Sequence, residues 1–236
     1  VRDRRFEFIV LEDKTINAFA APGGIIGINL GMFLNTEREG ELASVMCHEL
    51  AHLSQRHFAR SQNRNSPLAN ALMILGSIAV AAASRNPEAI LIAPAAMQQM
   101  SINYTRSNEK EADRIGFNNL VKAGFDPNDM TMMFQRMQDK YQNEDSEQFS
   151  YLMTHPLPSE RLTDMRIRAD GLKNNSKNSF RDNLDFYLMQ KRAQVWAEKD
   201  IKELVKRFKK NLKSQNENTE VSNRYGLSLA YKKSKD

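Results

Sequence analysis

Two histidines and a glutamate in the run MCHELAHLSQRHF have the types and spacing of a zinc hydrolase. His48 and His52 are four residues apart, so on an α-helix both imidazoles lie on one face and converge on one metal ion. Glu49 lies beside them, where a base is needed to turn a zinc-bound water into a nucleophile. With only 4 histidines in 236 residues, composition alone produces this match in about one per cent of such chains or fewer.

A third protein ligand is needed, and the segment RSNEKEADRIGFNNL offers candidates. Glu109 and Asp113 are four residues apart and share one helical face. We expect Glu109 to complete a His₂Glu set for one Zn²⁺ per chain, with a fourth position open to water. Asp113 is expected to accept the outer N–H of a zinc histidine. Glu111 is the rival ligand, but it lies about 200° round the helix from Glu109.

The elements that must position these groups are also visible in the sequence. Residues 36–53 combine a capping-type acidic start with an apolar stripe, which predicts a helix anchored in a core. Ahead of it, alternating apolar residues from Phe6 and the turn Pro22-Gly23-Gly24 predict a short sheet. An edge strand with Asn17, Ala18 and Phe19 is our candidate for binding an extended peptide. The alternative is that Phe19 fills the core and Asn17 caps a turn.

HELAH followed by EKEAD resembles the gluzincin metallopeptidase family that includes HtpX and the Oma and CAAX prenyl proteases. The stretches NAFAAPGGIIGINLGMF and THPLPSERL agree with this family, and the likeness covers about residues 1–170. Among its members, the bacterial BepA-like periplasmic proteases with a carboxyl-terminal tetratricopeptide region fit best. The resemblance implies an α+β fold, mostly helical, with a small β-sheet and the HExxH helix.

The family's His-Pro motif corresponds to His155 and Pro156, and its CAAX prenyl protease branch suggests a role for two residues. There a histidine and an arginine six residues on are thought to stabilise the tetrahedral intermediate, which implies catalytic roles for His155 and Arg161. A second interpretation makes His155 an additional zinc ligand that blocks the open position. The third is a turn histidine bonded to backbone.

We expect structural roles for His57 and Cys47. On a continuous helix His57 lies about 180° round from His48, so we expect a packing or hydrogen-bonding residue. Cys47, the single cysteine, is expected to be a small buried hydrophobe.

The chain divides by composition into residues 1–172, the peptidase domain, and residues 173–236, a helical region that resembles the beginning of a tetratricopeptide-like array. Within the first part, residues 67–104 form an apolar insertion, which we expect to be a helical hairpin. Peripheral membrane contact through this hairpin stays an open alternative.

The zinc motif predicts a zinc metalloendopeptidase, and the resemblance to the BepA-like proteases implies that it cleaves misfolded or stalled outer-membrane proteins in the periplasm of a Gram-negative bacterium. Its partners would include outer-membrane proteins and their assembly machinery, bound through the helical repeat. The absence of a signal sequence at Val1 is expected of a trimmed chain. The alternative function is a zinc-stabilised chaperone or adaptor with little proteolysis. The net charge is +5, but the basic residues concentrate in about the last 65 residues and follow helical spacing, as on a solvated helix face, so we expect no nucleic-acid partner.

Overall fold

A three-stranded sheet lies at the amino-terminal end of the computed structural model, which describes residues 6–21, 23–64, 92–143, 150–173, 183–212 and 217–234. β3 (Ile25–Asn29) is central, pairing in parallel with β1 (Glu7–Leu11) and antiparallel with β2 (Ala18–Ala21). Gly23 and Gly24 join β2 to β3 at φ 97° and 88°, a conformation that favours glycine. All five residues of β1 are exposed, so the predicted alternation does not bury one face of that strand.

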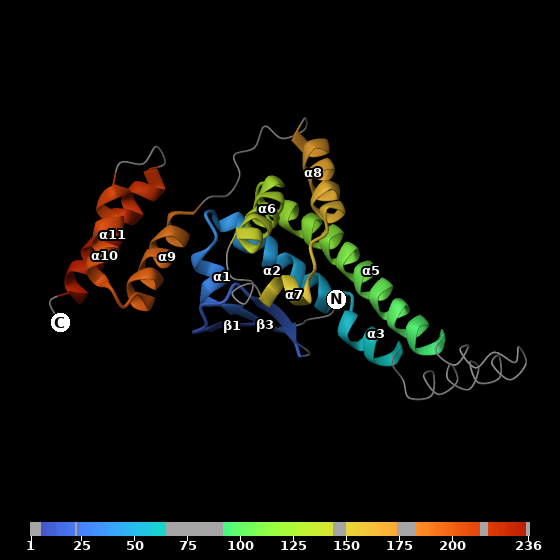
Figure 1. Cartoon of the computed structure of the whole chain (residues 1–236). Coiled ribbons are helices and arrows are strands. Elements are labelled where there is room, and N and C mark those ends of the chain that lie inside the picture. The colour runs from blue at the N-terminus through green and yellow to red at the C-terminus, as the bar shows by residue number, and fades with distance from the viewer. Residues whose placement is uncertain are drawn as a thin grey trace, which may run out of the picture.

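Helices make up most of the rest of the described chain (Figure 1). In chain order they are α1 (Leu30–Leu34), α2 (Glu39–Ser54), α3 (His57–Arg64), α5 (Ile92–Lys122), α6 (Asn128–Asn143), α7 (Ser150–Thr154), α8 (Ser159–Lys173), α9 (Leu184–Ala197), α10 (Ile201–Lys210) and α11 (Glu217–Lys233). The prediction of a mostly helical protein with a small sheet is therefore confirmed.

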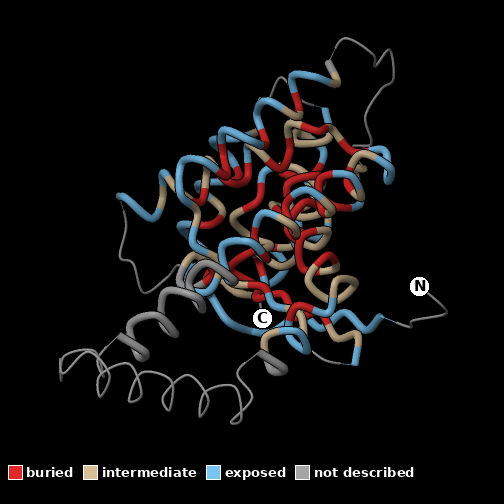
Figure 2. Tube along the Cα trace, turned by 90° about the vertical axis from the view of Figure 1, so that its right-hand side faces the viewer, coloured by how far each residue is buried: buried red, intermediate tan, exposed pale blue. Residues whose placement is uncertain are grey.

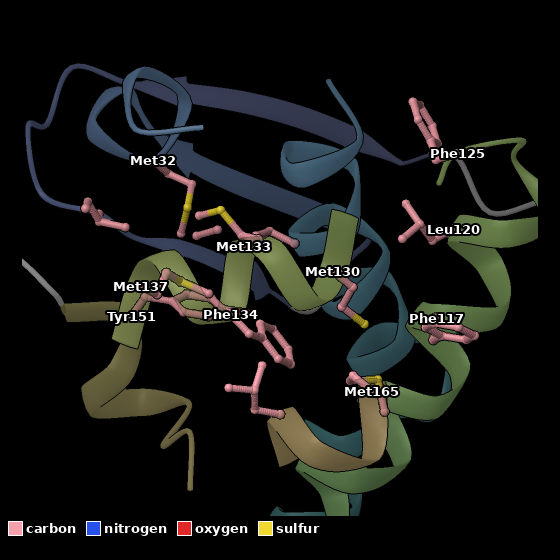
Figure 3. Packing of buried hydrophobic residues seen from close by; sticks show 14 of the residues in the cluster. Met32, Phe117, Leu120, Phe125, Met130, Met133, Phe134, Met137, Tyr151 and Met165 are labelled. Atoms are coloured by element: carbon pink, nitrogen blue, oxygen red, sulfur yellow. The ribbon is translucent and has the colours of Figure 1, made fainter. Parts of the chain in front are cut away.

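The main hydrophobic core lies around α2, which packs on the sheet and against α5 and α6. α8 packs on α5 and α6 and completes this core. Buried residues concentrate at the centre of this region (Figure 2). Methionines and aromatic residues fill much of it, among them Met133, Phe134 and Met137 of α6 (Figure 3). Flexible thioether side chains suit the irregular gaps between helices and sheet.

The start of α2 is fixed by a buried carboxylate. Glu41 is fully buried, and its Oε2 accepts the backbone N–H of Glu37 at 2.6 Å. Arg136 of α6 donates to Glu41 Oε1 at 3.0 Å. A buried, paired carboxylate near a helix amino terminus also interacts favourably with the helix dipole. The Glu41–Arg136 contact thus joins the first turn of α2 to α6, on the amino-terminal side of the two histidines.

The apolar insertion lies partly outside the described residues. Residues 65–91 are not described, and the first arm of the predicted hairpin falls among them. Residues 92–104 form the first part of α5, which continues without interruption to Lys122. Among the described residues, no helix is long and apolar enough to cross a membrane.

The carboxyl-terminal helices form a second, smaller core from Val195, Leu204, Phe208 and Ala230. α9 connects them to the first part of the protein, since Gln190 donates to the backbone oxygens of Phe33 and Thr36 at 3.0 and 2.7 Å. Of the polar stretch LKNNSKNS (residues 172–179), Leu172 and Lys173 form the end of α8, and residues 174–179 lie outside the described residues.

Candidate metal centre

His48 and His52 lie on successive turns of α2 and point toward the same place. Their Nε2 atoms are 3.0 Å apart. His48 is fully buried, whereas His52 is partly exposed. The helical spacing therefore brings the two imidazoles together as the sequence analysis predicts.

Glu109 reaches the same place from α5. Its Oε2 lies 3.3 Å from His48 Nε2 and its Oε1 lies 3.3 Å from His52 Nε2. Although burial alone would raise the pKa of Glu109, hydrogen bonds to His155, His48 and His52 hold that pKa well below its usual range. Glu109 is thus a buried anion facing two imidazoles.

The close approach of α5 to α2 depends on Gly116, which the sequence analysis did not single out. A Cβ at this position would lie 3.0 Å from both the Cα and the backbone nitrogen of His48. Contacts this short force the helices apart, so glycine permits the crossing distance that brings Glu109 to the histidines. A glycine three residues after Asp113 in a helical pattern was the available signal.

The outer nitrogen of His48 faces Asp113, with 3.0 Å between Nδ1 and Oδ1. Arg161 of α8 donates twice to Asp113, each time at 2.7 Å, and its NH1 lies 3.0 Å from Glu109 Oε2. Burial by itself lowers the pKa of His48, but hydrogen bonds to Asp113 and Glu109 outweigh it and raise that pKa to about 9. Arg161 is only 3% exposed, so it lies behind the metal-facing groups and holds two of their carboxylates.

The outer nitrogen of His52 faces His57, with 2.9 Å between the two Nδ1 atoms. This contact exists because α2 ends at Ser54 and Arg56 adopts a φ of 54°, so the chain turns before α3 begins at His57. The expected hydrogen-bonding role for His57 is compatible with this geometry, but the expected continuous helix is wrong. Glu111, the rival ligand, bonds His57 Nε2 at 3.0 Å and lies outside the ligand cluster.

His155 enters the cluster from the segment that follows α7. Its Nδ1 lies 3.1 Å from both carboxylate oxygens of Glu109, and its Nε2 lies 3.6 Å from Glu49 Oε1. The His155 ring stacks on the Tyr151 ring with centroids 4.6 Å apart. The backbone N–H of His155 donates to the Tyr151 backbone oxygen. One ligand atom each from His48, His52, Glu109 and His155 lie within 4.8 Å of one another.

These four residues fit a metal ion by their chemistry as well as by their spacing. A tetrahedral zinc site with bonds of about 2.0–2.1 Å has ligand-to-ligand edges of about 3.3 Å. The separations of 3.0 to 3.3 Å among His48, His52 and Glu109 match these edges. Since Asp113 and His57 face the outer nitrogens of the two histidines, both Nε2 atoms and a carboxylate are left facing one point, which suits a cation.

Glu49 is buried beside the cluster, and its Oε1 makes no hydrogen bond. The 3.6 Å separation from His155 Nε2 is too long to count as one. A buried carboxylate oxygen without a donor is costly, and it indicates a group that bonds a molecule at the site.

The candidate substrate-binding residues lie at and before β2, an edge strand that packs against α2. Ala18 is buried, and the ring of Phe19 covers Gly27 on β3. Asn17 accepts the backbone N–H of Asn29 through its own backbone oxygen at 2.9 Å. Because ladder bonds alternate, the backbone groups of Ala18 and Ala20 point away from β3 toward the edge.

A helix that carries His-Glu-x-x-His, faced by a glutamate from a second helix, is the arrangement of a gluzincin metallopeptidase. Residues 1–169 match peptidase family M48, and the chain belongs to that family. The resemblance inferred from HELAH and EKEAD is confirmed.

The chain is also similar to named proteins. It is 41% identical over 232 residues to a putative β-barrel assembly-enhancing protease of Vibrio cholerae, covering 96% of this chain and 47% of that protein. It is 39% identical over 197 residues to the β-barrel assembly-enhancing protease of Escherichia coli K12, covering 80% and 39%. The mitochondrial metalloendopeptidase OMA1 of Schizosaccharomyces pombe is 30% identical over 160 residues, covering 68% and 45%. The chain therefore spans less than half the length of these relatives.

Proposed function

We propose that this protein is a zinc-dependent endopeptidase. The observation that carries the proposal is the convergence of His48, His52 and Glu109 on one point, with the unbonded carboxylate oxygen of Glu49 beside it. Membership of peptidase family M48 supports the reaction class. His48, His52 and Glu109 are the residues that would hold the ion.

Glu49 carries the proton transfers of the proposed reaction. When bound, Zn²⁺ supplies Lewis-acid polarisation of the scissile carbonyl and acidifies water. Glu49 removes a proton from the attacking water and later gives it to the leaving amine. Asp113 and Arg161 act from behind the ligands: Asp113 orients His48, and Arg161 holds Asp113 and Glu109 in place. We thus assign Arg161 a positioning role in place of the contact with the reacting group that the CAAX prenyl protease likeness implied.

His155 is proposed to serve as a fourth ligand in a closed, resting form. Its Nδ1 lies as near to Glu109 as the zinc-motif histidines do, and a ligand there would exclude the attacking water. Opening would require the segment from Tyr151 to His155 to move away from Glu109.

The substrate is proposed to be an extended polypeptide that adds to the edge of β2. The outward backbone groups of Ala18 and Ala20 would bond the peptide, and Asn17 and Phe19 flank its path. Strand addition recognises backbone, so it suits unfolded segments of many sequences.

For the whole protein, we infer a role in the assembly of outer-membrane β-barrel proteins in the periplasm of a Gram-negative bacterium. The Vibrio and Escherichia relatives, which are named β-barrel assembly-enhancing proteases, support this role. We propose that residues 1–172 form the peptidase domain and that residues 173–236 begin a tetratricopeptide-like region that binds client proteins and their assembly machinery. The insertion at 67–104 is the proposed place of any peripheral membrane contact.

A digestion assay tests the proposed function. Unfolded outer-membrane β-barrel protein and casein are incubated with the purified zinc-loaded chain, its Glu49→Gln variant and the chelator-treated protein. Cleavage by the wild type alone supports a peptidase. Zinc binding with prevention of aggregation but no cleavage by any form would favour the chaperone or adaptor alternative.

A further inference from the structure

The two zinc-motif histidines have outer partners that differ in chemistry. His48 faces the carboxylate of Asp113, whereas His52 faces a second imidazole, that of His57. His57 is only 4% exposed, and its Nε2 lies 3.0 Å from Glu111 Oε2. Arg60 donates to the same Glu111 oxygen at 3.0 Å. The contacts form one continuous chain from His52 to the surface of α3 and α5.

The direction of the hydrogen bonds in this chain is determined by its outer end. An ionised carboxylate only accepts, so His57 Nε2–H donates its hydrogen bond to Glu111. His57 then keeps a lone pair on Nδ1, which accepts the Nδ1–H of His52. His52 is left with an Nε2 lone pair aimed at Glu109 and His48, as a metal ligand requires.

We propose that His57 is a positioning residue, which holds His52 in its ligand tautomer and ring orientation through the Nδ1 contact, with Glu111 fixing the tautomer of His57. The inference rests on the proposed function, because it concerns the affinity of that same site for zinc.

The backbone between the two histidines supports this assignment. On a continuous helix, His57 would lie about 140° round the axis from His52 and could not face it. The end of α2 at Ser54 and the φ of 54° at Arg56 bring His57 back to His52. Positive φ is uncommon for a residue other than glycine and indicates a turn that the surrounding contacts enforce.

Asparagine and glutamine at position 57 separate the two hydrogen bonds of the imidazole. The side-chain oxygen of asparagine occupies the place of Nδ1 and still accepts from His52. The amide of glutamine reaches toward Glu111 in the place of Nε2 but offers His52 no acceptor. The experiment measures Zn²⁺ affinity of the full chain by competition with a chromogenic chelator, and the visible absorption of the Co²⁺ form, for His57→Ala, His57→Asn and His57→Gln.

We expect His57→Ala and His57→Gln to weaken Zn²⁺ binding by about 10- to 100-fold, with an altered Co²⁺ spectrum. His57→Asn should recover most of the affinity and the wild-type spectrum. Glu111→Gln keeps an acceptor oxygen and should bind Zn²⁺ more tightly than Glu111→Ala. If His57→Ala does not fold, the comparison of Zn²⁺ affinity between His57→Asn and His57→Gln still tests the positioning role.

The inference would be overturned if His57→Asn and His57→Gln lost equal Zn²⁺ affinity, in proportion to the loss of stability of the metal-free proteins. That result would indicate that His57 acts through packing alone. Unchanged Zn²⁺ affinity in all three variants would overturn it while leaving the proposed function intact. A wild-type protein that binds no Zn²⁺ would overturn both.

Discussion

His155 Nδ1 lies 3.1 Å from both carboxylate oxygens of Glu109, although 46 residues separate them in the chain. This contact places the histidine of the His-Pro motif among the metal-facing groups, opposite His48 and His52. A group in that position either closes the site or takes part in the reaction.

Replacement of His155 by alanine distinguishes these roles. If His155 is a closing ligand, His155→Ala should raise peptidase turnover about fivefold or more. Losing even about 1 kcal/mol of the free energy that favours the closed form changes the closed-to-open equilibrium constant by about that factor. Initial rates of casein cleavage at saturating zinc provide the measurement. A loss of about 100-fold instead would make His155 a donor to the developing oxyanion.

Glu49→Gln should abolish most of the peptidase activity and leave metal binding intact. The amide cannot accept the proton of the attacking water, and the loss of a general base costs about 10²- to 10⁴-fold in rate. Zinc content by elemental analysis and cleavage rates should be compared with those of His48→Ala. Glu49→Gln losing as much zinc as His48→Ala would contradict its role as a base.

Glu109→Ala should lose zinc, because it removes the carboxylate that faces both Nε2 atoms. Glu111→Ala should keep the ion with a smaller loss of affinity, because Glu111 contacts His57 and not the ligand cluster. Equilibrium competition with a chelator measures both variants. The opposite order would exchange the roles of Glu109 and Glu111.

Gly116→Ala should destabilise the protein by about 1–3 kcal/mol, since the added methyl overpacks the backbone of His48. This cost exceeds the gain of up to about 1 kcal/mol that alanine brings to a helix. Gly171→Ala in α8 is the matched control, because a Cβ there meets nothing within 4 Å, and it should be neutral or stabilising. Urea unfolding curves give both values, and equal effects would argue against a close helix crossing at Gly116.

Ala20→Pro should lower the cleavage of extended peptides. The substitution removes a backbone N–H that points to the open edge of β2, and proline is tolerated on edge strands. Ala20→Val keeps the N–H and serves as the control for side-chain size. KM and kcat for a fluorogenic peptide should be determined for both, with circular dichroism to establish folding. Equal losses in the two variants would remove the case for strand addition.

The parts of the site that depend on helical periodicity could be predicted from the sequence. A spacing of four residues places two side chains on one face of an α-helix. This spacing predicted the pair His48 and His52 on one helix and the pair Glu109 and Asp113 on a second helix. The family likeness followed from the same ordered motifs, and the match over residues 1–169 confirmed it. The hairpin turn at Gly23 and Gly24 was equally local.

The relationships that depend on how a helix ends and how two helices cross could be read only from the folded chain. The turn at Arg56 brings His57 to His52, where the sequence predicted a continuous helix. The packing of α8 turns Arg161 onto Asp113, and the segment after α7 carries His155 to Glu109. The last two contacts join residues 48 and 46 positions apart, and their geometry depends on the whole core, because no periodicity in the chain encodes the direction in which a loop returns.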